Sequence, residues 1–220
     1  MTAWLRVVQG EWEHRLACAL RFDDHFFRTP VAEDLIVQLT SSGPYQPLRS
    51  AAGQPRHGDG TYRFADLPDG HYDVGVQSPS RRFVSWTTPL AVALPLAHPT
   101  DAVVYELWPT ATAPAVPGIT TARGRLVGAG VANLQVELAP VASGFSGRFT
   151  RADASGEFLF PLPGKAALES DGRLLLAVRV DGGARTVTGG VVGAGPAAVT
   201  FAGAELRVVP SRESRVTFNV

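Results

Sequence analysis

The sequence predicts an all-β protein built from two tandem domains of similar fold, and three observations support this prediction. The 220-residue chain contains 23 Gly and 17 Pro, and short segments of alternating apolar and polar residues dominate it. Two long segments resemble each other at a spacing of roughly 100 residues, which suits a duplicated domain and is too long for a solenoid repeat. A proline-rich segment separates the two copies.

The clearest part of the repeat is a turn followed by a strand with aromatic residues at alternate positions. The first copy reads "DGTYRFADLPDG" from residue 59, and the second reads "DASGEFLFPLPG" from residue 153. Alternation with period 2 is typical of a half-buried strand, and the glycine before each strand supplies a turn. We therefore predict that the paired aromatics are core residues and that the paired glycines form turns: Tyr62 and Phe64 with Phe158 and Phe160, and Gly60 with Gly156.

Further strands are expected on both sides of this motif in each copy. "EDLIVQLT" at 33–40 resembles "ANLQVELA" at 132–139, and "HYDVGVQS" at 71–78 answers "RLLLAVRV" at 173–180. Near the N-terminus, "GEWEHRLACALRF" has apolar residues at helical spacing and also at alternate positions. Because the rest of the chain is all-β, we interpret that segment as a strand.

These repeats divide the chain into a first domain at 1–108, a linker at 109–118 and a second domain at 119–220. The linker, with the last residue of the first domain, reads "WPTATAPAVPG" and contains three prolines and no charge. Such a composition favours extended polyproline II backbone, so the linker is expected to act as a semi-rigid spacer.

Composition argues against several classes of protein. Twenty basic residues balance twenty acidic ones, and Arg81 and Arg82 are the only adjacent basic pair, so no nucleic-acid partner is predicted. Cys18 is the only cysteine, which rules out an intrachain disulfide and a multi-cysteine zinc site. The longest apolar run, "PLAVALPLA", is too short to span a bilayer. Glu11, Glu13 and His14 fall where a signal peptide needs apolar residues, so synthesis in the cytoplasm is expected, with release as part of a particle as the alternative.

The second copy resembles the carboxypeptidase regulatory-like domain, a transthyretin-like β-sandwich. The resemblance rests on "GRLVGAGVANLQVELAP" followed by "TRADASGEFLFPLPG", in which Gly124, Asp153 and Gly156 hold the family's glycine and aspartate positions. The first copy fits with "RHGDGTYRFADLPDGHYDVGV" and departs at its start, where "RFDDHFFRTPV" replaces the glycine-led strand. The resemblance implies two tandem transthyretin-like or Ig-like β-sandwiches and says little about function.

One local group of residues has catalytic or metal-binding potential: Asp23, Asp24 and His25. On a strand, Asp23 and His25 would share a face, which is the starting arrangement for a metal or acid–base site. The alternative is an Asp-rich turn with an exposed histidine, which we favour because Asp-Asp breaks strands. Elsewhere, Asp59 and Asp153 are expected to hydrogen-bond turns, and "GGVVGAGPAA" at 189–198 is expected to form strand and turn rather than a phosphate loop.

Trp86 and Trp108 are the candidate interaction residues, because they lie near a domain end and the linker. The leading hypothesis is a non-enzymatic structural or adaptor protein with protein partners and no cofactor. The joint "YELWP" at 105–109 resembles joints in accessory proteins of contractile, phage-tail-like particles. A carbohydrate- or cell-surface-binding adhesin is the second hypothesis, and a metal-dependent enzyme built on Asp23, Asp24 and His25 is the third.

Overall fold

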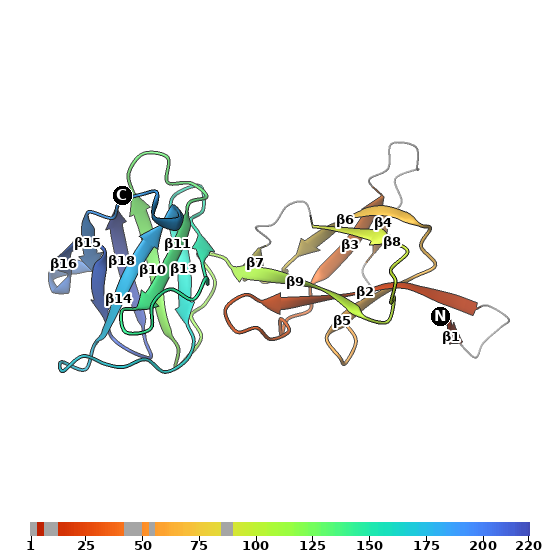
Figure 1. Ribbon diagram of the computed structural model, residues 1–220, viewed down its shortest axis with the longest axis horizontal. Coiled ribbons are helices and arrows are strands. Elements are labelled where there is room, and N and C mark those ends of the chain that lie inside the picture. The colour runs from red at the N-terminus through yellow and green to blue at the C-terminus, as the bar shows by residue number, and fades with distance from the viewer. Residues whose placement is uncertain (1–3, 7–12, 42–49, 53–55, 85–89) are drawn as a thin grey trace. The chain divides into compact units, whose positions relative to one another are not determined.

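The computed structural model describes residues 4–6, 13–41, 50–52, 56–84 and 90–220. The chain forms two compact units, Met1–Trp108 and Pro109–Val220 (Figure 1). Both are built from strands, and each is described below by itself. Trp86 lies outside the described residues.

The described residues of the first unit form two sheets. One has the order β1-β2-β9-β7, with β5 also paired to β2, and the other has the order β4-β3-β6-β8. The strands are β1 (Trp4–Arg6), β2 (Glu13–Asp24), β3 (Ile36–Ser41), β4 (Ser50–Ala52), β5 (Thr61–Ala65), β6 (Gly70–Gln77), β7 (Phe83–Val84), β8 (Ala91–Leu94) and β9 (Ala102–Pro109). The segment with ambiguous periodicity is therefore a strand, β2, as predicted.

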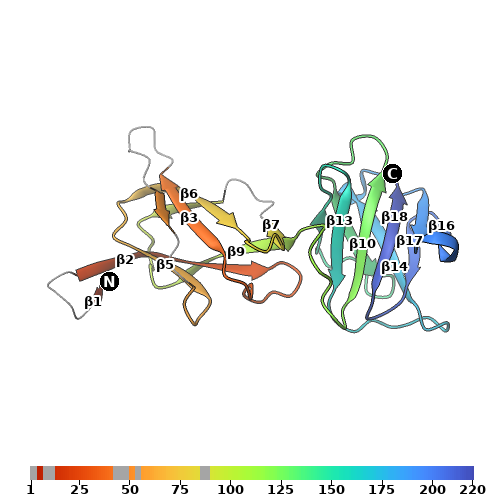
Figure 2. The same cartoon turned by 180° about the vertical axis from the view of Figure 1, so that it is seen from behind.

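The second unit also has two sheets, with the orders β13-β10-β18-β15-β16 and β12-β11-β14-β17. Figure 2 shows β13, β10 and β18 side by side. The strands are β10 (Thr120–Val127), β11 (Gln135–Pro140), β12 (Thr150–Arg151), β13 (Glu157–Leu162), β14 (Leu174–Val180), β15 (Gly189–Val192), β16 (Val199–Ala202), β17 (Glu205–Val208) and β18 (Glu213–Asn219).

The strand pairings of the two units correspond. The order β5-β2-β9-β7 matches β13-β10-β18-β15, and β4-β3-β6-β8 matches β12-β11-β14-β17. In each unit the first and last strands of this shared framework pair in parallel: β2 with β9, and β10 with β18. The other strand pairs whose register is known, such as β2–β5 and β10–β13, are antiparallel. The fold class is therefore all-β with two tandem β-sandwiches, as the sequence predicts. No described strand of the first unit corresponds to β16.

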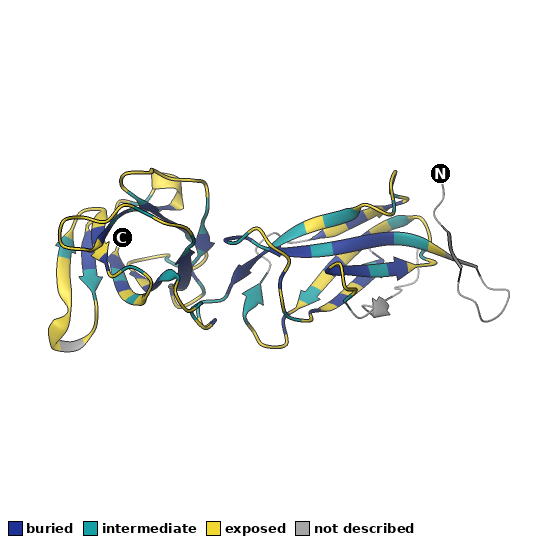
Figure 3. Cartoon of the chain, turned by 90° about the horizontal axis from the view of Figure 1, so that it is seen from below, coloured by how far each residue is buried: buried dark blue, intermediate teal, exposed yellow. Residues whose placement is uncertain are grey.

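The repeated aromatics are core residues, which confirms that prediction. Tyr62 and Phe64 are each 2 % exposed, Phe158 is 0 % exposed and Phe160 is 2 % exposed. Figure 3 shows buried residues interleaved with exposed ones along the strands of the first unit, and β3 follows that pattern from Ile36 to Leu39. Gly60 and Gly156 have φ of 81° and 83°, a left-handed turn conformation that favours glycine.

The proline-rich segment is not the extended spacer that its composition suggests. Turns close within it, because the Ala113 amide donates to the Thr110 carbonyl and the Ile119 amide to the Val116 carbonyl. The guanidinium of Arg123, on β10, donates to the carbonyls of Ala111 and Ala113. Arg123 therefore ties residues 111–113 to the second unit, which begins at Pro109.

Arg123 also pairs with Glu213 on β18, with its Nε 3.0 Å from Oε1. The hydrogen bond from Arg123 holds the pKa of Glu213 below its usual range. A carboxylate with a depressed folded-state pKa stabilises fully above its ordinary pKa, about 4.3, and loses that effect as pH falls through the depressed value.

We expect Arg123→Gln to speed amide exchange in residues 111–113 at neutral pH, because two carbonyls lose their charged donor. In the unaltered protein the same amides should exchange faster, relative to intrinsic rates, only once acid protonates Glu213. Hydrogen exchange read by mass spectrometry measures both effects, with Arg125→Gln as the exposed arginine control on the same strand. Equal protection in Arg123→Gln and the control would contradict this role.

Candidate interaction surfaces

The structure does not bring Asp23, Asp24 and His25 together into one site. Asp23 forms a two-point ion pair with Arg21, and both nitrogen–oxygen distances are 3.0 Å. The Asp24 carboxylate accepts the amides of Phe26 at 2.8 Å and Phe27 at 3.2 Å, which closes the turn after β2. Burial raises the pKa of Asp24 despite these two amides. The interpretation as an Asp-rich turn is therefore only partly right: Asp24 caps a turn, but Asp23 and Asp24 are the last residues of β2. The expected exposed histidine is wrong, because His25 is 2 % exposed.

His25 is buried and is held by β9. Its Nδ1 lies 2.6 Å from Oε2 of Glu106, which also forms an ion pair with Arg28. The imidazole ring stacks on the indole of Trp108, with 4.7 Å between ring centroids. Trp108 is only 4 % exposed, so the prediction of Trp108 as a surface anchor is wrong. The reason is that its indole face is covered by a histidine distant in the sequence.

The two turn aspartates act as predicted. The Asp59 carboxylate accepts the amide and hydroxyl of Thr61, and these bonds hold its pKa below the usual range. Partial burial raises the pKa of Asp153, but hydrogen bonds from Ser155 and Glu157 outweigh that effect and the net shift is downward. The glycine-rich segment at 189–198 forms β15 and a following 3-10 turn, also as predicted.

Neither a metal centre nor a membrane-spanning helix is found among the described residues. Within them, no group of three or more His, Cys, Asp and Glu side chains is arranged to hold a metal ion. None of the helices in the described part of the chain has the length and apolarity to cross a membrane.

The open edge of β16 is the first candidate interaction surface. Among the described strands, β16 lies at the end of its sheet and pairs with β15 alone. The other three edge strands of the second unit carry charge: β12 has Arg151, β13 has Glu157, and β17 has Glu205 and Arg207. β16 has none, and the whole segment 186–204 is uncharged. Val199 on β16 is 54 % exposed.

A groove of about 760 Å³ runs between the β15–β16 hairpin and β17. Arg173, Arg207 and Arg215 line it, together with Glu205 and Glu213. Because Glu213 is already paired with Arg123, the groove carries an excess of positive charge. A strand laid along β16 would therefore find apolar contacts at Val199 and arginine partners across the groove.

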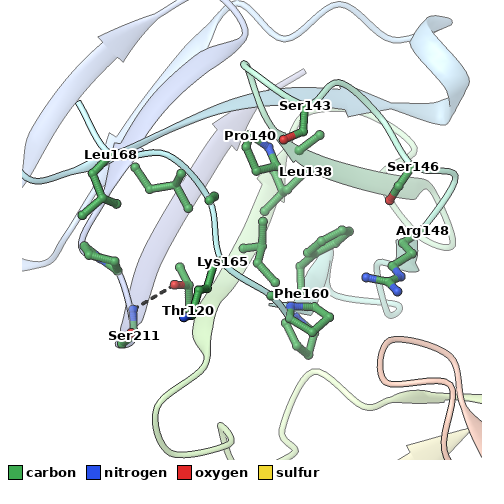
Figure 4. A pocket seen from close by; sticks show the side chains of 18 of the residues that line it. Thr120, Leu138, Pro140, Ser143, Ser146, Arg148, Phe160, Lys165, Leu168 and Ser211 are labelled. Atoms are coloured by element: carbon green, nitrogen blue, oxygen red, sulfur yellow. Dashed lines mark hydrogen bonds between the residues drawn. The ribbon is translucent and has the colours of Figure 1, made fainter.

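The second candidate surface is a pocket of about 450 Å³ at the end of the second sandwich where β10 and β14 begin (Figure 4). We call it the end pocket. Leu138, Phe160 and Leu174 are buried and form its floor. Its walls come from the β11–β12 loop, the β13–β14 loop and the β17–β18 turn, where the Ser211 amide donates to the Thr120 hydroxyl at 2.8 Å. This assembly from several loops explains why no local sequence motif indicates it.

An ion pair with a buried carboxylate and a partly exposed guanidinium fixes the β11–β12 loop. Glu137 on β11 is 2 % exposed and pairs with Arg179, with 2.5 Å between Oε2 and Nη2. Gln135 donates to the other carboxylate oxygen at 2.8 Å. The Arg179 guanidinium lies over the ring of Phe145 at 4.4 Å from its centroid, a cation–π contact. The loop that supplies one wall of the end pocket is thereby anchored to the outer face of its sheet.

Comparison with known proteins gave matches among solved structures only. No family model matches the chain, and no curated protein does. The Bacillus anthracis TIE protein is 13 % identical with a TM-score of 0.30, and the match covers 92 % of this chain but only 34 % of that one. The shaft pilin SpaA of Lactobacillus rhamnosus GG is 11 % identical with a TM-score of 0.32, covering 92 % and 96 % of the two chains. A streptococcal ancillary pilin is 15 % identical with a TM-score of 0.30, covering 92 % and 61 %. All three scores are below 0.5, so the fold rests on the strand pairings above.

Proposed function

We propose that this protein is a non-enzymatic structural or adaptor module that joins a larger protein assembly through the open edge of β16. The single observation that carries the proposal is that β16 alone among the edge strands of the second unit is uncharged. An edge strand presents unpaired backbone donors and acceptors, and proteins commonly blunt such edges with charge. An edge left uncharged and apolar is suited to pairing with a strand of another chain.

The partner strand that fits is one with acidic side chains on the face toward the groove. Arg173, Arg207 and Arg215 would pair with those carboxylates, while backbone hydrogen bonds to β16 would fix the register. Among the described strands, β16 has no counterpart in the first unit.

We further propose that the assembly is a contractile, phage-tail-like particle. The joint at Tyr105–Pro109 resembles joints in accessory proteins of contractile, phage-tail-like particles, and carboxypeptidase regulatory-like domains provide the matching sandwich pattern. The carbohydrate-binding alternative relies on Trp86 and Trp108 as sugar-contacting residues. Trp108 does not fit that role, because it is buried against His25.

Photocrosslinking tests the edge directly. A photoreactive phenylalanine analogue replaces Thr200 on β16 in the cells that make the protein, and the control places it at Val127, which is 47 % exposed on the inner strand β10. We expect one discrete crosslinked protein from position 200 and none from position 127. Equal crosslinking from both positions, or from neither, would count against β16 as the assembly edge.

A further inference from the structure

We infer that the end pocket binds the carboxyl-terminal end of a polypeptide, with an apolar last side chain on its floor and the free carboxylate at its basic rim. This site is separate from the β16 edge and does not depend on the proposed function. Three features of the pocket support it: its charge, its hydroxyl groups and its difference from the corresponding end of the first unit.

The charge of the lining is one-sided. Arg148 and Lys165 both line the pocket, and none of its described lining residues is Asp or Glu. Figure 4 shows Phe160 between Arg148 and Lys165. Among the residues that the structure describes, neither cation lies within ion-pair distance of a carboxylate. Two unneutralised cations beside an apolar floor are complementary to an anionic group attached to an apolar one.

The hydroxyl groups favour a peptide over a fatty acid. Ser143 and Ser146 line the wall formed by the β11–β12 loop. Within the described part of the chain, neither hydroxyl has a hydrogen-bond partner. A peptide backbone offers amide groups to such hydroxyls, whereas an alkyl chain offers none. Leu168, 51 % exposed at the rim, adds apolar surface for a second residue of the peptide.

The first unit provides an internal comparison. At its corresponding end, the described residues Leu67, Leu94 and Leu96, with Arg15 and their neighbours, enclose only about 10 Å³. The β5–β6 connection there spans residues 66–69, whereas the β13–β14 connection spans 163–173. Leu67 and Leu96 pack against the core of that unit. The longer β13–β14 connection is therefore a feature of the second unit, and it supplies Lys165 and Leu168 to the end pocket.

Titration of the whole protein by NMR tests the inference. The probe is a short peptide ending in -Ala-Leu with a free carboxylate, and its matched control is the same peptide with a C-terminal amide. We expect shifts confined to the pocket residues and about tenfold weaker binding of the amide, since it lacks the charge that the rim attracts. Arg148→Gln and Lys165→Gln should each weaken binding of the free-carboxylate peptide about three- to fivefold, and Arg125→Gln should leave that binding unchanged.

Two further variants separate binding from folding. Ala166→Phe places a ring in the pocket and should abolish binding with an unchanged melting transition. If that variant fails to fold, Leu168→Ala removes an exposed side chain and should weaken binding while leaving the core intact. Equal binding of acid and amide, no binding at millimolar peptide, or shifts spread outside the pocket would overturn the inference. Tighter binding of decanoate than of the peptide would assign the pocket to fatty acids and would also overturn it.

Discussion

Replacing Phe158 with alanine is expected to destabilise the second unit by about 3–5 kcal/mol, the usual cost of truncating a buried phenylalanine. Phe158 is 0 % exposed, and its ring stacks on Phe218 with 5.7 Å between centroids. For a unit of this size, such a loss should lower the melting transition by roughly 10–30 °C. Phe145→Ala is the matched control, because that ring is 37 % exposed, and it should shift the transition by only a few degrees.

Labelling of the only cysteine reports on the first unit independently of the second. Cys18 lies in the core of the first unit at 0 % exposure, and burial raises the pKa of its thiol to about 12. The thiol should therefore react with a thiol reagent only when the first unit opens. We expect Phe158→Ala to leave the labelling rate of Cys18 unchanged while the melting temperature of the second unit falls. A silent thermal scan for Phe158→Ala would show that the repeated aromatic motif is not a core requirement.

Replacing Gly124 with alanine is the second large effect, and it should depend on Phe158. A Cβ at Gly124 would lie 2.2 Å from Cζ of Phe158 and 2.7 Å from Cγ2 of Val216, across the β10–β13 and β10–β18 pairs. Overpacking a closed core in this way costs about 1–3 kcal/mol. In the Phe158→Ala background the ring is absent and only the Val216 contact remains, so Gly124→Ala should cost less there.

A double-mutant cycle by urea denaturation measures that coupling. Gly75→Ala serves as the control because Gly75 also lies in a strand, yet a Cβ there would meet its nearest atom at 3.8 Å. That substitution should be neutral or slightly stabilising. Equal costs of Gly124→Ala in the two backgrounds would mean that Phe158 is not the obstacle.

The sequence predicts the sandwich framework well because local patterns determine it. Alternation identifies the strands around Tyr62 and Phe158, and their repetition identifies the duplicated domain. The errors concern contacts between residues distant in sequence. The prolines of 109–118 predicted an extended spacer, but Arg123 binds the carbonyls of that segment.

Both candidate surfaces escaped prediction for the same reason. β16 is short and has no alternation of charge, so its exposure becomes visible only when it is seen at the end of a sheet. The end pocket takes Arg148 and Lys165 from two loops that no motif connects. Trp108 shows the opposite error, since an aromatic residue beside a proline-rich joint suggested a surface anchor and is buried by His25.

Sedimentation of the native protein from gently lysed cells tests most directly whether β16 joins this chain to a larger assembly. The unaltered protein should sediment with a particle far larger than its own 23.3 kDa. Val199→Lys with Thr200→Lys places charge on the edge strand and should shift the protein to the position of the free chain, whereas Val127→Lys should leave it with the particle. Sedimentation of the unaltered protein as a free chain, or of the Val199→Lys, Thr200→Lys variant with the particle, would contradict the proposal.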